Sequence, residues 1–420
     1  MTVTSVRPEG LSAYIAVTAS YWVFMLTDGA LRMLVLLHFH TLGFSPVQLA
    51  YLFVFYEIAG IVTNLSAGWI AARFGLTSTL YAGLGLQILA LLSLTQLDPN
   101  WVVGVSVVFV MLVQGASGVA KDLTKMSSKS AVKLLAPAEN GGLFRWVALL
   151  TGSKNIVKGL GFLVGAALLA TLGFVWAVLG MAAILTVILL VVLFAMPPGL
   201  PKGRRSTKFS EVFSKSANVN WLSAARVFLF GARDVWFVVG IPIYFYAVLS
   251  DGTTEGNRTA FFLIGIFMAG WVILYGVVQA NAPRILRAKN RSESDLITAA
   301  RGWAWSLAAV PLVLTLSSMF TTEPQMWLTL TLVVGLLVFG AIFAVNSSLH
   351  SYLILSFSTA ERVTMDVGFY YMANATGRLA GTLLSGLTYE IGGLSLMFGT
   401  AAVMVGLSAV TVGFLRPGQG

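Results

Sequence analysis

Long apolar stretches recur along the whole chain and constrain its fold more than any other feature. A helix needs about 20 apolar residues to cross the hydrocarbon core of a bilayer, and we find twelve stretches of this kind. Inside a bilayer every backbone polar group must be satisfied internally, which a helix achieves. We therefore predict an all-α, polytopic membrane protein with twelve transmembrane helices. The predicted spans are 12–38, 47–71, 77–96, 101–121, 146–170, 175–196, 219–249, 260–282, 297–320, 326–350, 363–387 and 394–415.

The composition agrees with this prediction. Of the 420 residues, 57% are hydrophobic and 10% are charged, whereas soluble globular proteins carry about 25% charged residues. The chain has no cysteine, which excludes disulfides, thiolate metal sites and cysteine nucleophiles. Its three histidines give little material for a metal cluster, so we expect no metal and no cofactor. The N-terminus lacks the basic segment, short apolar core and cleavage site of a signal peptide, and we expect no cleaved leader.

A polar and basic segment, Pro197 to Ser216, separates the sixth predicted span from the seventh. Its content of proline, glycine and charged residues is typical of a solvated linker. We therefore divide the chain into three parts. These are an N-terminal six-helix half at 1–196, a cytoplasmic linker at 197–217 and a C-terminal six-helix half at 218–420.

The lysines and arginines are distributed unevenly between the two sides of the membrane. Placing the N-terminus inside puts nineteen of the 26 in predicted cytoplasmic segments and one, Arg258, in an outer loop. By the positive-inside rule, both termini are predicted to be cytoplasmic. The net charge of +10 is then mostly a topology signal, and we expect no nucleic-acid binding. Six cations remain within the spans: Arg32, Lys154, Lys158, Arg226, Arg233 and Arg378.

The two halves contain a weak internal repeat. Shifting the fifth span by 220 residues onto the eleventh pairs Lys158 with Arg378 and Gly161 with Gly381. Parallel six-helix repeats about an axis along the membrane normal are the plan of major facilitator transporters. The segment Gly68–Gly75, "GWIAARFG", also resembles the loop signature of that superfamily, although alanine replaces its aspartate. The sequence therefore favours the major facilitator fold, with two pseudo-symmetric halves.

Ionisable residues at membrane depth are functional candidates, because exposure to lipid would be costly. The acids at this depth are Asp28, Glu57 and Asp234. Each could carry a proton in coupled transport or could be held in an ion pair. Asp28 and Arg32 are four residues apart, a spacing that predicts an intrahelical pair. The adjacent Arg233 and Asp234 point in different directions on a helix and are expected to pair less well.

Lys154 and Lys158 are stacked one turn apart on one face of the predicted fifth span, which contains no acidic residue. At 1.5 Å per residue they lie roughly 12 Å and roughly 18 Å deep, too far from the headgroups to reach them easily. One interpretation is that the buried cations pair with Glu57 or Asp234 of a neighbouring helix. The acids are too few to match every cation, however, and a surplus of positive charge attracts an anion. We therefore predict an anionic small-molecule substrate bound by Lys154, Lys158, Arg233, Arg378 and Arg32.

Three other features have simpler interpretations. Arg226 lies near the inner end of its span and is expected to extend toward the headgroups. The spacing Gly161-x-x-x-Gly165 predicts close packing between helices. Lysines at every fourth position predict a helix extension on anionic lipid, in preference to an electropositive vestibule. These lysines are Lys121, Lys125, Lys129 and Lys133.

Four long blocks of the sequence resemble the organoarsenical efflux transporters called ArsJ, and the resemblance extends over most of the chain. The blocks are "YWVFMLTDGALRMLVLLHFHTLGFSPVQLAYLF" (21–53), "GVAKDLTKMSSKSAVKLL" (118–135), "LTGSKNIVKG" (150–159) and "SAARVFLFGARDVWFVV" (223–239). The resemblance implies a bacterial inner-membrane protein that exports 1-arseno-3-phosphoglycerate and protects the cell from arsenate. It also implies a functional link to glyceraldehyde-3-phosphate dehydrogenase, which makes that ester when arsenate replaces phosphate. The ester is a polyanion, in agreement with the buried cations.

Other functions stay open at this point. An antiporter for another organic phosphate or for a carboxylate would use the same cations. A membrane enzyme would need a nucleophile–base set or metal ligands, and the sequence shows no such clustering, so we expect no catalytic residues. A receptor would need an appended signalling domain, for which the linker and the termini are too short.

Overall fold

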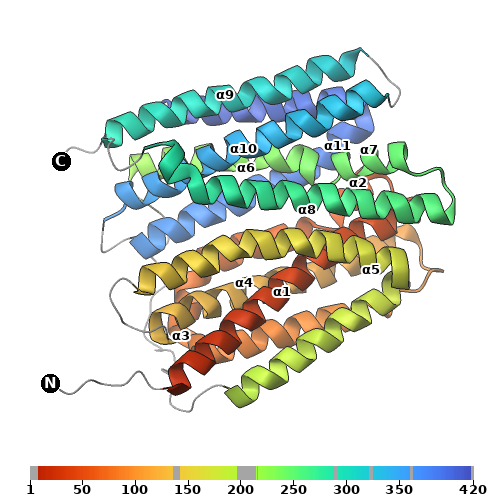
Figure 1. Ribbon diagram of the computed structural model, residues 1–420, viewed down its shortest axis with the longest axis horizontal. Coiled ribbons are helices and arrows are strands. Elements are labelled where there is room, and N and C mark those ends of the chain that lie inside the picture. The colour runs from red at the N-terminus through yellow and green to blue at the C-terminus, as the bar shows by residue number, and fades with distance from the viewer. Residues whose placement is uncertain are drawn as a thin grey trace.

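The computed structural model describes residues 8–135, 142–195, 214, 216–287, 292–320, 325–359 and 363–417. All regular secondary structure in these ranges is helical (Figure 1). The helices are α1 (Pro8–Thr41), α2 (Pro46–Tyr51), α3 (Val54–Leu94), α4 (Val103–Leu135), α5 (Gly142–Ala195), α6 (Ala217–Phe237), α7 (Gly240–Leu249), α8 (Thr254–Ile285), α9 (Glu293–Met319), α10 (Met326–Phe357) and α11 (Val363–Val412).

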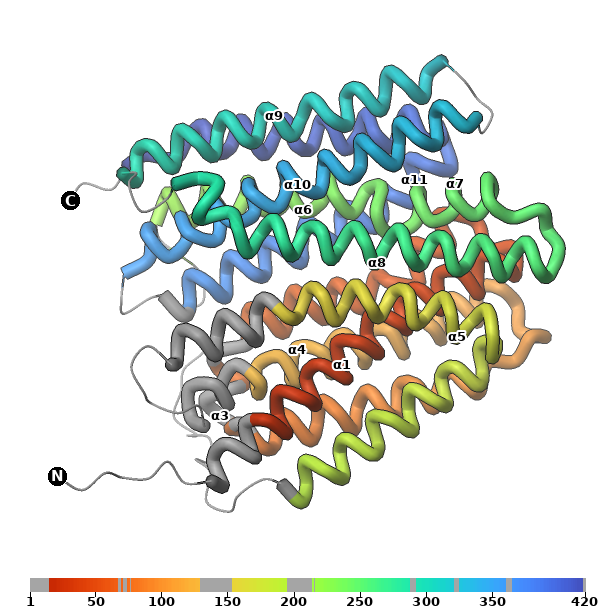
Figure 2. Tube along the Cα trace, viewed as in Figure 1, coloured from red at the N-terminus to blue at the C-terminus, as the bar shows by residue number. Residues whose placement is uncertain are grey.

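Ten stretches of the described chain are long and apolar enough to cross a membrane. Two of them, Ser153–Phe194 in α5 and Met365–Val412 in α11, contain 42 and 48 residues. At 1.5 Å per residue each would be roughly 60 to 70 Å long if straight, about twice the hydrocarbon thickness. Both contain a backbone break, at Gly173 and at Gly392–Gly393, and α5 visibly doubles back on itself (Figure 2). The predicted all-α, polytopic fold is confirmed, and the ten stretches are consistent with twelve crossings.

Glycine allows the chain to reverse its direction sharply at two points. The backbone angle φ is 77° at Gly173 in α5 and 75° at Gly75, which separates the two parts of α3. Residues with a Cβ rarely adopt these conformations, whereas glycine does so at no steric cost. In both helices a new crossing therefore begins directly after the glycine.

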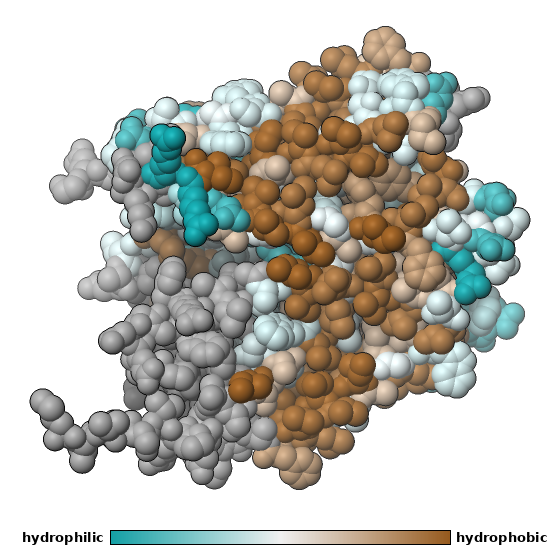
Figure 3. Space-filling model, viewed as in Figure 1, coloured by the Kyte–Doolittle hydropathy of each residue, from teal (hydrophilic) through white to brown (hydrophobic). Residues whose placement is uncertain are grey.

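The helices form two groups that lie side by side, a first helix group (α1–α5) and a second helix group (α6–α11) (Figure 1). The start of α1 and the end of α11 lie at the same end of the bundle, which we call the terminal end. A broad apolar band crosses the face shown in Figure 3, and polar side chains gather toward both ends, as expected of a protein that spans a bilayer. Most of the predicted linker at 197–217 lies outside the described residues, so the domain boundaries remain a prediction.

The helix is interrupted within two crossings. α2 and α3 form one crossing, joined by a turn at Leu52–Phe53 whose backbone angles stay in the right-handed helical region. α6 and α7 form another, with a break at Val238–Val239, where Val239 has non-helical backbone angles (φ −125°, ψ −54°). Non-helical backbone at membrane depth is tolerated only where it is buried in protein or lines a polar space. Glu57 follows the first interruption and Asp234 precedes the second, each by four residues. Each interruption is therefore about one turn from a buried carboxylate.

Close packing of the first and fifth crossings depends on glycine in both helix groups. A Cβ on Gly161 of α5 would collide with the backbone carbonyl of Leu26 in α1. Gly165, one turn further along α5, packs against the backbone of α1 in the same way. In the second helix group, a Cβ on Gly381 of α11 would collide with the backbone carbonyl of Gly231 in α6. The predicted close packing at Gly161-x-x-x-Gly165 is confirmed. The shift of 220 residues thus relates equivalent helix contacts in the two groups.

Candidate functional site

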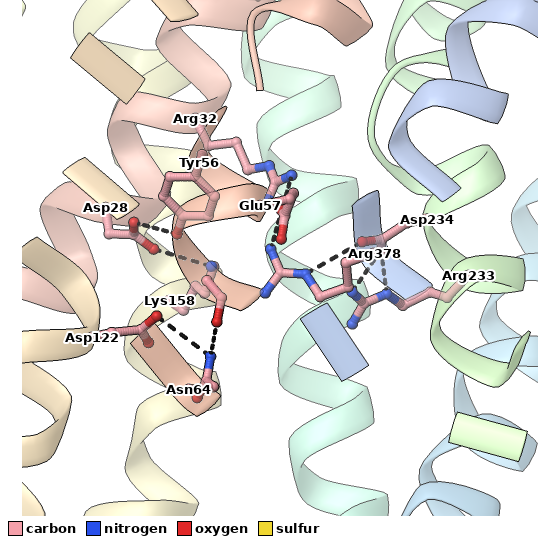
Figure 4. Close-up of polar contacts among 11 residues, drawn as sticks. Asp28, Arg32, Tyr56, Glu57, Asn64, Asp122, Lys158, Arg233, Asp234 and Arg378 are labelled. Atoms are coloured by element: carbon pink, nitrogen blue, oxygen red, sulfur yellow. Dashed lines mark hydrogen bonds and ion pairs between the residues drawn. The ribbon is translucent and has the colours of Figure 1, made fainter. Parts of the chain in front are cut away.

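Seven charged side chains from five helices gather where the two helix groups meet, and we call them the central charge cluster (Figure 4). Its members are Asp28 and Arg32 of α1, Glu57 of α3, Lys158 of α5, Arg233 and Asp234 of α6, and Arg378 of α11. The sequence predicted every one of them as a site residue. The eighth predicted residue, Lys154, lies one turn from Lys158 on the same helix, and its part in the site stays a prediction.

Both carboxylate oxygens of Asp28 contact side chains of the first helix group. Lys158 Nζ lies 3.0 Å from Asp28 Oδ2, and the Tyr56 hydroxyl donates to Asp28 Oδ1 at 2.6 Å. Lys121 Nζ of α4 lies 4.0 Å from the centroid of the Tyr56 ring. The ring face is electron-rich and attracts this ammonium group. Tyr56 was not predicted as a site residue, because a tyrosine in an apolar span is unremarkable until its partner is known.

Glu57 and Arg378 join the two helix groups. Glu57 Oε1 accepts from Arg32 Nη2 at 3.1 Å and from Arg378 Nη2 at 2.5 Å. Arg378 Nε also lies 3.4 Å from Asp234 Oδ2, an ion-pair contact rather than a hydrogen bond. Arg233 closes the chain of contacts, with Nη2 at 2.5 Å from Asp234 Oδ1. A continuous series of ion pairs therefore runs from α1 through α3 to α11 and α6.

Two expectations about pairing are wrong, the predicted Asp28–Arg32 pair and the expected weak pairing of Arg233 with Asp234. Asp28 does not pair with Arg32, four residues along α1, because Lys158 and Tyr56 occupy both of its oxygens and Arg32 turns to Glu57. Arg233 and Asp234 do pair, because the long arginine side chain curls back to its neighbour. Lys158 consequently has a counter-ion in its own helix group. The alternative interpretation, in which cations pair with Glu57 or Asp234, holds for Arg378.

Two further expectations about basic residues are also wrong. Arg226 is 4% exposed and does not extend to the headgroups, because Ser347 and Asn374 accept its hydrogen bonds inside the second helix group. Lys121 is 8% exposed and packs on Tyr56, so it does not rest on lipid. The side chains of Lys129 and Lys133, and those of the loop signature except Trp69, Ile70 and Phe74, lie outside the described residues.

The acids and the cations of the central charge cluster differ in exposure. The three carboxylate side chains are 1 to 2% exposed, whereas the four cationic side chains are 13 to 18% exposed. The acids thus form the buried support and the cations form the accessible surface. A molecule that reaches the cluster meets mainly positive charge, from lysine as a point charge and from arginine as a planar fork suited to oxyanions.

A smaller polar cluster lies on α3 and α4. Asp122 is 1% exposed and accepts from Thr63 Oγ1 at 2.5 Å. Lys125 Nζ lies 3.4 Å from Asp122 Oδ1 and donates to Asn64 Oδ1 at 2.8 Å. This carboxylate is held by protein donors. Within the described ranges no three His, Cys, Asp or Glu side chains come together in a group that could hold a metal ion.

The two helix groups also meet at the end of the bundle opposite the terminal end. The Val47 N–H of α2 donates to Glu390 Oε2 of α11 at 2.9 Å. The rings of His40 and Tyr246 pack edge to face with their centroids 4.8 Å apart. A Cβ on Gly386 of α11 would collide with the backbone of α2. These contacts close the interface between the groups at that end.

Solved structures of known transporters are similar to the chain over almost its whole length. A mutant of the nucleoside transporter NupG is 16% identical, with 96% of this chain and 98% of that chain covered and a TM-score of 0.64. A POT family transporter in complex with 5-aminolevulinic acid is 12% identical, with 99% and 97% covered and a TM-score of 0.72. No family model matches the chain, and no curated protein matches it by sequence. The chain is a multi-pass membrane protein with the major facilitator fold.

Proposed function

We propose that this protein is a secondary transporter that exports an organic polyanion by alternating access, and that the substrate is 1-arseno-3-phosphoglycerate. The observation that carries the proposal is the central charge cluster, in which accessible cations from both helix groups rest on buried carboxylates. The likeness to solved transporters supports the class of function. The sequence resemblance to the organoarsenical efflux family supports the particular substrate.

The binding step is an exchange of counter-ions. Four cations in a membrane protein need negative charge nearby at all times, because an unpaired buried charge is strongly unfavourable. Without substrate, Asp28, Glu57 and Asp234 supply that charge. A phosphate or arsenate group brings oxygens that suit an arginine fork better than one shared carboxylate oxygen does. The substrate therefore competes with Glu57 for Arg32 and Arg378.

This exchange also links binding to movement. Arg378 of the second helix group is tied to Glu57 of the first. When an anion takes the place of Glu57, the ion pair between Arg378 and Glu57 is broken, and the two helix groups are connected through the bound substrate instead. The groups can then re-pack about the occupied site, which is how a ligand with different affinity for two states shifts a conformational equilibrium.

The orientation suits export. With the terminal end placed in the cytoplasm, as the positive-inside rule predicts, the contacts between Val47 and Glu390 and between His40 and Tyr246 close the outer end. Substrate then enters from the cytoplasm of a bacterium, where glyceraldehyde-3-phosphate dehydrogenase would produce the ester. Asp28, Glu57 and Asp234 are the candidates for proton coupling.

Everted inner-membrane vesicles test the proposal directly. Glyceraldehyde-3-phosphate dehydrogenase, glyceraldehyde 3-phosphate, arsenate and NAD+ as the hydride acceptor, all outside the vesicles, generate the ester during the assay. Organic arsenic inside is measured with and without a pH gradient. We expect uptake only in vesicles that contain the protein. Uptake of other organic phosphates or carboxylates without uptake of the ester would favour an antiporter for those anions instead. No uptake of any anion would contradict transport.

A further inference from the structure

A second group of buried polar residues lies in the second helix group, about 10 Å along α6 from the central charge cluster and toward the terminal end. At its centre is Arg226, whose side chain is 4% exposed. Arg226 Nε donates to Asn374 Oδ1 of α11 at 3.0 Å. Its Nη1 donates to the carbonyl and hydroxyl oxygens of Ser347 on α10, at 3.2 and 3.0 Å. The Phe230 ring covers the guanidinium at 3.9 Å.

The charge of Arg226 is not compensated by the protein residues around it. Across the described chain, no carboxylate lies within ion-pairing distance of its guanidinium, and its partners are neutral oxygens and the rings of Phe230 and Tyr370. Every cation of the central charge cluster, by contrast, contacts an acid. A buried charge whose partners are all neutral is strongly unfavourable. Arg226 therefore needs an anion.

Unpartnered buried polar side chains lie on α6 and α10, the helices that carry Arg226 and its partner Ser347. Asn346 and His350 of α10 are both 0% exposed and lie four residues apart, hence on one face of the helix. Ser347, between them in sequence, accepts a hydrogen bond from Arg226, and His350 lies about one turn further along the same helix. Both amide atoms of Asn346, both ring nitrogens of His350 and Ser223 Oγ lack a hydrogen-bond partner among the described residues.

The chemistry of these groups selects the ligand. Buried polar groups in native proteins almost always have partners, and Asn346, His350 and Ser223 each offer an N–H or O–H donor. The guanidinium repels cations and attracts anions. All of these side chains have almost no exposed surface, so the anion must be small. A dianionic organic phosphate would need the more open central charge cluster.

We propose that α6, α10 and α11 enclose a binding site for a small inorganic anion of halide size, held by the Arg226 guanidinium and by donors from Asn346, His350 and Ser223. The anion compensates the charge of Arg226 and fixes the packing of these three helices. It is separate from the transported substrate, and the inference does not depend on the identity of that substrate.

The test is the thermal unfolding of the purified full-length protein in detergent, with chloride or bromide exchanged for gluconate at constant ionic strength. We expect chloride and bromide to raise Tm by about 2 °C or more in a saturable way, because a ligand that binds only the folded state stabilises it. Gluconate is too large for the site. In Asn346→Leu and His350→Leu, which remove unpartnered polar atoms and keep an apolar filling, the halide concentration for half-maximal stabilisation should rise at least about fivefold.

Lys158→Gln serves as the matched control, because it removes a buried cation from the central charge cluster and leaves the Arg226 group unchanged. Its halide response should equal that of the wild type. Equal Tm values in halide and gluconate for the wild type would overturn the proposal. So would an unchanged halide response in both leucine variants, or a response lost only in Lys158→Gln. None of these outcomes bears on uptake of the organic anion, which tests the transport function separately.

Discussion

The two helix groups use the same arrangement of charges in different ways. In the first, Lys158 of α5 pairs with Asp28 of α1, and in the second, Arg378 of α11 faces Asp234 of α6. Three residues after each cation, a glycine packs against the partner helix. The lysine pair is completed within its own group by Tyr56, whereas the arginine fork reaches across to Glu57.

The difference follows from the side chains. A lysine is a point charge that one carboxylate can satisfy, and an arginine has five donors in a rigid fork that can serve two carboxylates at once. Arg378 can therefore belong to its own group and to the opposite group simultaneously. The first group thus supplies a self-contained charge pair, and the second supplies the connection between the groups. Removing Arg378 should consequently do more damage than removing Lys158.

The largest effect is expected for Arg378→Gln. This change leaves Glu57 with only Arg32 and Asp234 with only Arg233, and breaking a buried ion pair costs about 3–5 kcal/mol of stability. Vesicle uptake should fall below detection and Tm in detergent should drop. The double variant Arg378→Gln with Glu57→Gln should recover Tm without recovering uptake. Normal uptake by the single variant would show that the connection between the groups is dispensable.

Lys158→Gln should have the next largest effect, mainly on substrate affinity. Losing a desolvated charge contact costs about 2–5 kcal/mol, which corresponds to a KM increase of roughly 30-fold or more. Tm should also fall, because Asp28 keeps only Tyr56 as a direct partner, and an added Asp28→Asn should restore it. Lys158→Arg should keep part of the activity. If uptake kinetics of Lys158→Gln equal those of the wild type, this lysine is structural.

Substitution of the packing glycines should give a moderate and equal loss of stability in the two groups. A methyl group at Gly161 or Gly381 meets a backbone carbonyl, and overpacking of this kind costs about 1–3 kcal/mol. Gly180→Ala is the matched control, since a Cβ at that helical position meets open space. Melting in detergent measures all three. A loss at Gly161→Ala without a loss at Gly381→Ala would break the equivalence of the groups.

The smallest effect is expected for the coupling between Asp28 and Arg32. A double-mutant cycle on Tm with Asp28→Asn and Arg32→Gln should give an interaction energy near zero. The cycle of Asp28→Asn with Lys158→Gln should give a clearly stabilising one, because these two side chains are the ones in contact. If the Asp28–Arg32 cycle gave the larger interaction energy, the intrahelical pairing predicted from the spacing on α1 would be correct after all.

The sequence was sufficient for the fold and for the membership of the central charge cluster, but not for its connections. The bilayer requires apolar stretches of a set length, separated by helix-breaking residues, so the spans can be predicted from the sequence. Buried charges stand out in apolar spans for the same reason. The partners of Asp28 and Arg32 lie on other helices, and a spacing rule within one helix does not contain that information.

Arg226 and Lys121 show a second limit of the sequence. Both lie toward the cytoplasmic ends of their predicted spans, where a cation commonly extends to the headgroups. Whether it does depends on the direction in which the helix face points, which is set by packing against other helices. Tyr56, Ser347 and Asn374 decide the outcome here.

If Glu57 occupies the place of the substrate anion, the uptake kinetics of Glu57→Gln should reveal the competition. We expect KM for the arsenylated ester in everted vesicles to fall, by about tenfold for each 1.4 kcal/mol of competition removed, because Arg32 and Arg378 are no longer held by a carboxylate. Turnover should slow, because the variant lacks the ion pair between Glu57 and Arg378 that forms again when the substrate leaves. Glu255→Gln, at the start of α8 and outside the cluster, should leave both quantities unchanged. An unchanged or increased KM for Glu57→Gln would contradict the exchange of counter-ions.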